Sequence, residues 1–310
     1  MSTDFMEDLH RGAVKLLDGG TGTELQRRGV EMTSQAWCGG AALDNLATLE
    51  AIHRDYIEAG ADIITANTYA SSRLLLDLDG LGDQFERINR ETVRAAHRAR
   101  RDCGRSDVLV AGSLSHRGAL VEGTAAPDTG AAASVDALAV SVSELAHLLR
   151  EEGCDLILLE MMYDPAGMRP VLAAAAETAL PIWAGLSARR HPDGNILGFG
   201  PAHDVPFEEV VAILKGWPVD AAGVMHTPSD NVSDALRIVR GSFDGPLMAY
   251  PDSGYFKSPN WQFQDVIRPD DLRRFAERWV DEGVQILGGC CGLSPEHIAA
   301  LSPLRRAPER

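Results

Sequence analysis

The chain has 310 residues, of which 45% are hydrophobic and 24% charged, and its formal net charge is −16 at pH 7. This composition allows a sizeable core and excludes global disorder, and the acidic balance argues against nucleic acid or anionic membranes as partners. No stretch approaches the roughly 20 apolar residues that span a bilayer, and the acidic N-terminus lacks a signal-peptide pattern. The 5 cysteines, few and odd in number, favour a reducing compartment. We therefore expect a cytoplasmic protein.

Eight short apolar runs recur along the chain, and most of them are separated by segments with helical periodicity. The runs cover residues 13–17, 62–69, 108–113, 156–160, 181–187, 221–226, 246–250 and 283–287. The helix-like segments cover residues 46–59, 83–101, 135–152, 166–178, 207–215, 232–240 and 269–281. Strand–helix alternation with strands too apolar to be half exposed predicts a parallel sheet buried on both faces.

Eight such units favour a single-domain (β/α)8 TIM barrel over residues 1–310, in which the eighth strand closes on the first. The alternative is an open doubly wound sheet, but the chain lacks an early Gly-x-Gly-x-x-Gly motif. Residues 305–310 are expected to fray. A homo-oligomer is compatible with the sequence, which does not determine the oligomeric state.

Two connections are longer than a tight strand-to-helix turn. Residues 117–134 are irregular and rich in small residues, and residues 251–269 carry several aromatic side chains. The aromatic residues of the second connection are Tyr255, Phe256, Trp261 and Phe263. Both connections follow odd-numbered strands and should lie on the C-terminal face, where long loops are usually functional or mobile.

Polar residues interrupt the apolar pattern where the predicted strands end. They are Asp18, Asn67, Ser113, Glu160, Ser187, His226, Asp252, Cys290 and Cys291. In a barrel all these positions reach the C-terminal face, where active sites lie. Glu160, His226 and the two cysteines follow even-numbered strands, so one interior layer could hold them together.

Residues 288–292 read Gly-Gly-Cys-Cys-Gly and follow the eighth predicted strand. Two adjacent thiols can turn to one side only if the backbone leaves regular strand geometry, which glycine permits. Cys290 and Cys291 could be thiolate ligands of a soft metal, most simply zinc, or small buried residues at a tight strand end. His226 is the natural third ligand, because two thiolates and one imidazole leave a tetrahedral position open for substrate. Taken alone, His226 could also be a hydrogen-bonded histidine at a strand end.

Six segments carry a more specific signal, and they follow one another over nearly the whole chain. They are 17–25 (LDGGTGTEL), 59–69 (AGADIITANTY), 112–114 (GSL), 158–160 (LLE), 250–254 (YPDSG) and 288–292 (GGCCG). In this order they resemble the homocysteine S-methyltransferase family, which includes betaine-, S-methylmethionine- and S-adenosylmethionine-dependent members and the N-terminal module of cobalamin-dependent methionine synthase. The resemblance implies a zinc barrel that moves a methyl group from a small cationic donor to the thiol of homocysteine or a related small molecule.

The resemblance also implies roles for individual residues. Asp18 and Glu160 would hold the amino group of the thiol substrate by charge-assisted hydrogen bonds. Gly19 and Gly20 would let backbone N–H groups approach its carboxylate, and Asn67 would lie in the same substrate site. The alternatives are a helix cap or turn residue for Asp18 and an ion pair with a barrel arginine for Glu160.

Aromatic residues could face an onium methyl donor through cation–π contacts. The candidates are Trp37, Tyr69 and Tyr255. The alternative is that each of these residues is part of the packing, which is the more common role of a single aromatic residue at such a position.

One pair of residues departs from the family pattern. The family has Asn-Cys at the end of the sixth strand, whereas this chain has Met225-His226. Two thiolates and a neutral imidazole make a neutral zinc site, which should acidify a bound thiol more but leave its sulfur less electron-rich than three thiolates would. Zinc affinity should fall at low pH as His226 protonates.

Three hypotheses therefore stand. The first is zinc-dependent methyl transfer to homocysteine or a related thiol. The second is a diverged barrel enzyme that demethylates a betaine-like or sulfonium compound, and the third is a non-catalytic metal- or ligand-binding barrel. Because no cobalamin- or folate-binding module follows the barrel, a cobalamin-independent donor is expected.

Overall fold

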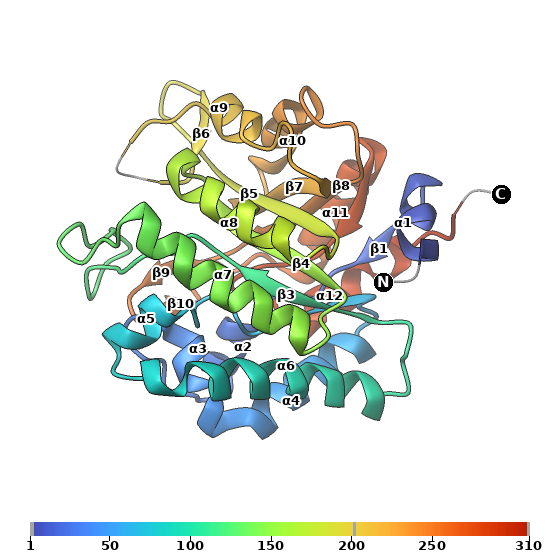
Figure 1. The fold of residues 1–310 in the computed structure, drawn as a ribbon. Helices are drawn as coiled ribbons and strands as arrows, with labels where there is room; N and C mark the ends of the chain where they lie inside the picture. Colours follow the sequence, from blue (N-terminus) through green and yellow to red (C-terminus); the bar gives the residue numbers. More distant parts are fainter. Residues whose placement is uncertain (1–2, 201–202, 309–310) are drawn as a thin grey trace.

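Eight parallel strands form the centre of the fold, which a computed structural model describes for residues 3–200 and 203–308. The strands are β1 (Lys15–Leu16), β2 (Ile63–Ala66), β3 (Leu109–Leu114), β4 (Leu156–Met162), β5 (Ile182–Arg190), β7 (Val219–Pro228), β8 (Leu247–Asp252) and β11 (Val284–Leu287). They pair in the order β1-β11-β8-β7-β5-β4-β3-β2, and a single parallel bridge from Leu17 to Ile63 links β1 to β2. The sheet is thus a nearly closed barrel, and the predicted (β/α)8 fold is confirmed (Figure 1).

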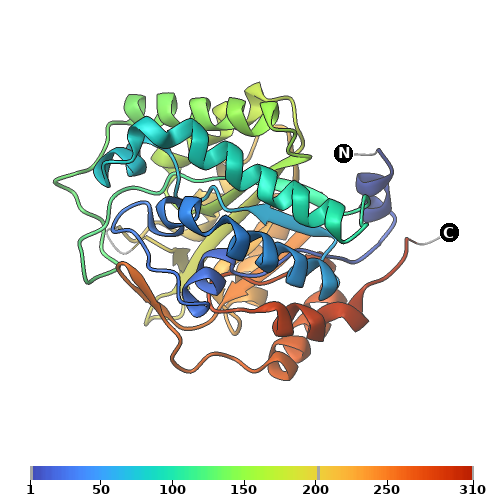
Figure 2. The ribbon, with the colours of Figure 1, turned by 90° about the horizontal axis from the view of Figure 1, so that it is seen from below.

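Helices cover the outside of the barrel, as the views in Figures 1 and 2 show. The helices close to the predicted ranges are α4 (Leu46–Glu58), α6 (Phe85–Asp102), α7 (Val135–Glu151), α8 (Pro165–Glu177), α9 (Phe207–Ala212), α10 (Val232–Arg240) and α11 (Pro269–Asp281). Besides the N-terminal helix, four short helices among the described residues were not predicted: α2 (Thr21–Arg27), α3 (Trp37–Ala41), α5 (Arg73–Leu78) and α12 (Pro295–Leu301). Their 5 to 7 residues are too few for a helical period to show in the sequence.

An N-terminal helix, α1 (Thr3–His10), closes the end of the barrel where the strands begin. Its Phe5 and Leu9 belong to the apolar cluster inside the barrel, and the rings of Phe5 and Trp183 lie 6.2 Å apart. The side-chain amide of Gln285, near the start of β11, donates to the Leu9 carbonyl. The opposite, C-terminal end of the barrel is therefore the open one.

The strands are buried on both faces, as predicted. Along β4, Leu156 and Leu158 lie in the interior cluster, whereas Ile157 and Leu159 pack in the layer between strands and helices. This alternation is the two-residue period of a strand, and it directs Glu160 into the C-terminal mouth of the barrel.

Small strands and loops add to this mouth. β6 (Ile196–Gly198) pairs antiparallel with the end of β5, and β9 (Tyr255–Lys257) forms a hairpin with β10 (Asn260–Gln262). The sequence predicts only a long, aromatic-rich connection for residues 251–269, so the hairpin is a finding of the structure. No helix among the described residues is long and apolar enough to cross a membrane.

The C-terminal segment differs from the expectation that it frays from Arg305 onward. The Arg305 guanidinium pairs with the buried carboxylate of Asp62. The backbone of Arg306 exchanges two hydrogen bonds with Val14, at 3.1 and 3.2 Å. A buried carboxylate and an open strand edge thus hold this segment, while residues 309 and 310 lie outside the described part of the chain.

A buried histidine on α4 leads to a prediction about stability. His53 is fully buried, and within the described residues neither ring nitrogen has a hydrogen-bond partner. Burial lowers the pKa of His53 from 6.5 to about 4. Between about pH 6.5 and pH 4 the unfolded state therefore binds a proton that the folded state does not. The free energy of unfolding should be highest above pH 6.5 and lower by about 2 kcal/mol near pH 5 from this group alone.

Urea unfolding of the wild type and of His53→Leu, near pH 7.5 and near pH 5, measures this contribution. The variant should lose about 2 kcal/mol of the pH dependence. His147→Leu, at an exposed position on α7, is the matched control and should keep it. An unchanged pH dependence in His53→Leu would contradict the prediction.

Candidate active site and metal centre

A cavity of about 180 Å³ occupies the C-terminal mouth of the barrel. Its volume suits an amino-acid-sized ligand rather than a macromolecule. Ten of the eleven residues that the sequence predicts for the site line it: Asp18, Gly19, Gly20, Trp37, Asn67, Tyr69, Glu160, His226, Cys290 and Cys291. Tyr255 does not.

Local backbone geometry lets neighbouring residues face the cavity together. Met161 and His226 have φ angles of 55° and 42°, in the left-handed region that such residues rarely adopt. As a result Glu160 and Met161 both line the cavity, and so do Met225 and His226, although consecutive strand residues normally point to opposite faces. Backbone strain of this kind is concentrated at functional sites.

The two cysteines reach the same side because they lie in a turn beyond β11 rather than in a strand. The Cys290 N–H donates to the Pro251 carbonyl, and the Cys291 carbonyl accepts from Ser253 N–H. Gly292 has a φ of 82°, and a Cβ there would lie 1.9 Å from the Ser253 oxygen. Only glycine therefore lets the turn approach the end of β8 so closely.

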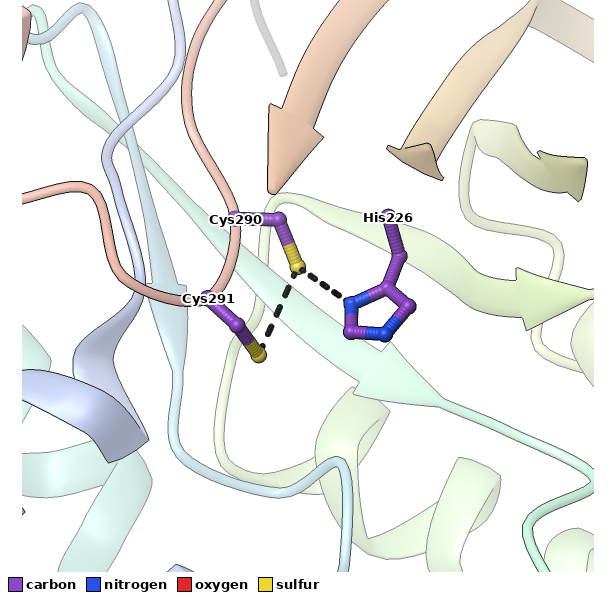
Figure 3. Close-up of side chains that lie close together, drawn as sticks. All are labelled: His226, Cys290 and Cys291. Carbon is purple, nitrogen blue, oxygen red and sulfur yellow. Dashed lines mark hydrogen bonds between the residues drawn. The ribbon is translucent and has the colours of Figure 1, made fainter. Parts of the chain in front are cut away.

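His226, Cys290 and Cys291 converge on one point (Figure 3). Cys290 Sγ lies 3.6 Å from His226 Nδ1 and 3.9 Å from Cys291 Sγ. One ligand atom from each residue lies within 4.8 Å of the other two. The sequence predicted this grouping from strands far apart in the chain, and the structure brings the three side chains together.

These distances fit a tetrahedral zinc ion. With zinc–sulfur bonds of about 2.3 Å and a zinc–nitrogen bond of about 2.0 Å, two sulfurs lie roughly 3.8 Å apart and a sulfur and a nitrogen roughly 3.5 Å apart. Three protein ligands would leave one tetrahedral position open, and all three side chains line the cavity. Hydrogen bonding to Cys291 and burial raise the pKa of Cys290 well above its usual value, so its thiol must lose a proton when metal binds.

Asp252 lies on the far side of the His226 ring from the cysteines. Its Oδ2 lies 3.8 Å from His226 Nε2, and within the described part of the chain its buried Oδ1 has no hydrogen-bond partner. Burial alone would lower the pKa of His226, but the Asp252 carboxylate and Cys290 outweigh it and raise this pKa to about 9. In metal sites a carboxylate behind a histidine ligand orients its ring, and here His226 Nδ1 faces Cys290 while Nε2 faces Asp252.

Replacing Asp252 by asparagine should therefore weaken metal binding by about 10- to 100-fold. Zinc competition with a chromophoric chelator measures the affinity, and the absorption spectrum of the cobalt-substituted protein reports a change in ligand geometry. Asp230→Asn, an exposed position in the turn after β7, is the matched control. Unchanged affinity and an unchanged cobalt spectrum in Asp252→Asn would show that the carboxylate does not position His226.

Two carboxyl groups also line the cavity, Asp18 and Glu160. The buried Asp18 accepts hydrogen bonds from Thr65 N–H at 2.7 Å and from Thr65 Oγ1 at 2.9 Å. Burial raises the pKa of Asp18 well above its usual value, although the two bonds from Thr65 oppose the shift. Burial also raises the pKa of Glu160 to about 7, against the lowering effect of a hydrogen bond from Ser113. A cationic group between these acids would stabilise both in the ionised form.

Gly19 and Gly20 have a structural role in addition to the predicted one, and for Gly20 a hydrogen bond competes with the predicted role. The Gly20 N–H donates to the Leu293 carbonyl at 3.1 Å, so it is not free to bind a substrate carboxylate. An added Cβ would lie 2.6 Å from the Cys290 oxygen at Gly20 and 2.6 Å from the Leu293 oxygen at Gly19. Both glycines are required because the turn that carries the cysteines packs directly on them.

Aromatic rings form much of the cavity wall. The His226 ring lies 5.0 Å from that of Phe199 and 5.6 Å from that of Trp261, and Trp37 lies 5.7 Å from Phe256. Trp37 and Tyr69 line the cavity, as expected. Such walls suit a cationic ligand through cation–π contacts.

Tyr255 corrects the sequence expectation. It is 51% exposed, and its hydroxyl contacts Gln264 rather than the cavity. Because side chains alternate along β9, the next residue, Phe256, takes the inward position.

Both long loops are held over the mouth by side-chain amides. Gln26 Nε2 donates to the Trp261 carbonyl and Gln26 Oε1 accepts from its N–H, both at 2.8 Å. Gln35 makes the same exchange with Leu120, at 3.1 and 3.0 Å. The cavity wall therefore belongs to one pre-organised unit with the barrel.

Several residues line the cavity or support it although the sequence predicted no role for them in the site. They are Thr65, Arg117, Met161, Tyr163, Phe199, Asp252, Phe256 and Trp261. Asp252 was noticed as a polar residue at a strand end, and Phe256 and Trp261 as part of an aromatic-rich loop. Tyr163 and Phe199 directly follow β4 and β6, and no pattern in the sequence marks either of them as part of the cavity.

Comparison with known proteins adds to this geometry. A family model described as homocysteine S-methyltransferase matches residues 15–304. A homocysteine S-methyltransferase of Escherichia coli (strain K12) is 28% identical over 306 residues, which cover 94% of this chain and 96% of that protein. A selenocysteine methyltransferase of Astragalus bisulcatus is 26% identical over 326 residues, covering 96% and 94% of the two chains.

Solved structures resemble the fold over the same length. The homocysteine methyltransferase MmuM from Escherichia coli superposes with a TM-score of 0.74 in its oxidized form, at 25% identity, covering 94% of this chain and 96% of that one. Its metallated form gives a TM-score of 0.72 at 24% identity with the same coverage.

Proposed function

The chain belongs to the homocysteine S-methyltransferase family and is an S-methyltransferase, and on this premise we propose that it transfers a methyl group from a small cationic onium donor to the thiol of homocysteine or a related small thiol. The observation that carries the proposal is the convergence of one imidazole and two thiols on a cavity that also holds two buried carboxyl groups. Family membership and these groups together set aside a non-catalytic barrel.

The proposed metal is zinc, held by His226, Cys290 and Cys291. The ligand distances and the soft donor set support this choice. Bound there, zinc would supply a Lewis acid that keeps the acceptor sulfur in its nucleophilic thiolate form.

The proposed role of Asp18 and Glu160 is to hold the ammonium group of the acceptor. Their burial makes isolated ionisation costly, so a cation between them is favoured and a neutral ligand is not. Thr65 and Ser113 fix the orientation of the two carboxylates by hydrogen bonds. The acceptor is thereby aligned before the methyl group moves.

The apolar, aromatic wall supports an onium donor in particular. As the new sulfur–carbon bond forms and the bond from methyl to the onium atom breaks, an anion and a cation become two neutral products. Charge therefore decreases along the reaction, and a cavity that excludes water favours such a transition state. The rings of Trp37, Tyr69, Phe256 and Trp261 would hold the cation beforehand.

Methyl transfer to homocysteine from a panel of donors, with betaine, S-methylmethionine and S-adenosylmethionine, tests the proposal. We expect product with at least one of these donors and about one zinc per chain in protein purified without chelators. Bound zinc without product from any donor would instead favour a diverged enzyme acting on another methylated substrate. His226→Cys recreates the three-cysteine ligand set of the family and shows whether this one substitution determines the activity.

A further inference from the structure

Arg117 is a charged residue at the cavity for which the proposed function so far has no use. It begins the long loop after β3 and lines the cavity with Asp18 and Glu160. Its guanidinium carbon lies 5.9 Å from the centre of the Tyr69 ring. The positive charge thus stands beside the aromatic wall.

The guanidinium lacks a full set of partners. One of its nitrogens, Nη1, donates to the Gln35 carbonyl, a neutral group. The other, Nη2, is buried and has no hydrogen-bond partner in residues 3–200 and 203–308. Burying a charged donor without a partner is costly, and a ligand in the cavity could supply the missing acceptor.

The surrounding chain holds Arg117 in place. Gln35 receives the Arg117 bond through its carbonyl and pairs with the Leu120 backbone through its side chain. The Gln35 and Ala36 N–H groups in turn donate to Asp79, at 3.0 and 2.7 Å. A guanidinium fixed by such a network is pre-organised for an anion, with little further loss of side-chain freedom on binding.

The chemistry of the cavity identifies the anion. Asp18 and Glu160 suit an ammonium group, and the Gly20 N–H that could have bound a carboxylate is already bonded to Leu293. Resting on the proposed function, we infer that Arg117 pairs with the carboxylate of an amino-acid substrate in this cavity. Guanidinium and carboxylate match in charge and in their planar, two-pronged geometry.

The carboxylate could belong to the thiol acceptor or to the methyl donor, and matched substrates distinguish them. Homocysteine is compared with homocysteine carboxamide, and S-methylmethionine with its carboxamide. In Arg117→Gln, kcat/KM should fall about 10- to 100-fold for the substrate whose carboxylate is bound and less than about threefold for its amide. Arg117→Lys keeps the charge without the fork, so its loss should be intermediate.

Arg169→Gln, an exposed arginine on α8, is the control and should change none of these values. A fall in kcat/KM for one acid but not for its carboxamide shows which substrate supplies the carboxylate that Arg117 binds. Equal losses on acid and amide, or no loss, would overturn the inference.

Binding is measured separately, so that failure of the proposed function is recognised. If the wild type transfers no methyl group, the rise in melting temperature with each acid and each amide still tests Arg117. The wild type should be stabilised more by an acid than by its amide, and Arg117→Gln should lose the difference. If each acid and its carboxamide raised the melting temperature of the wild type equally, the inference would be overturned. Circular dichroism of both Arg117 variants checks that they fold.

Discussion

Replacing Cys290 by serine should remove the metal from the protein and lower methyl transfer by more than about 100-fold, because loss of even an outer-sphere partner of a metal ligand costs about 10- to 100-fold. Cys290 lies between the other two candidate ligands, 3.6 Å from His226 Nδ1 and 3.9 Å from Cys291 Sγ. A serine hydroxyl is a poor zinc ligand and stays protonated. Zinc should fall from about one per chain to near zero, measured by mass spectrometry of the purified protein.

The other cysteines supply the control. Cys103→Ser changes a partly exposed thiol at the end of α6 and should leave zinc and activity unchanged. His226→Ala should lose zinc as Cys290→Ser does, whereas His226→Cys should retain it. Full zinc content in Cys290→Ser would remove this residue from the metal site, and full content in His226→Ala would remove the histidine.

Replacing Glu160 by glutamine should lower kcat/KM for homocysteine by about 10- to 100-fold, since a charge-assisted pair with the substrate ammonium is lost. Burial raises the pKa of Glu160 to about 7, and the pair requires the ionised form. In the wild type, kcat/KM should therefore rise with pH through about 7 and level off above it. In Glu160→Gln this rise should disappear.

An acceptor that has a hydrogen in place of the amino group distinguishes loss of the ammonium contact from a general disturbance of the active site in Glu160→Gln. Glu160→Gln should act on it nearly as well as the wild type does. Glu177→Gln, at an exposed position on α8, is the control for the charge change. If the loss were equal for acceptors with and without the amino group, Glu160 would not be an ammonium ligand.

His226 and Asp252 illustrate how far the sequence reaches. Each was visible as a polar residue at the end of an apolar run, and the barrel placed both at the same rim. That Asp252 stands behind the imidazole, 3.8 Å from Nε2, was not predictable. The distance depends on the left-handed backbone at His226, which no pattern in the sequence indicates.

Gly20 and Tyr255 are two residues for which the prediction from the sequence and the structure differ. Both were expected to contact substrate. The Gly20 N–H is taken by Leu293, some 270 residues further along the chain, and the hairpin of β9 and β10 turns Tyr255 outward and Phe256 inward. Both outcomes depend on contacts between segments that are distant in sequence or on a register that loop composition does not specify.

The amino-acid sequence by itself determined the barrel, the rim at which polar groups gather and the three candidate metal ligands. It could do so because burial on both faces makes each strand a continuous apolar run and because all parallel strands end at one face. Only the tertiary structure decided which of those groups have partners: Asp252 behind His226, Leu293 on Gly20 and no acceptor for Arg117 Nη2 among the described residues. The hydrogen-bond partners and the burial of single atoms depend on contacts between loops that follow different strands. The residue pattern within one segment does not specify these contacts.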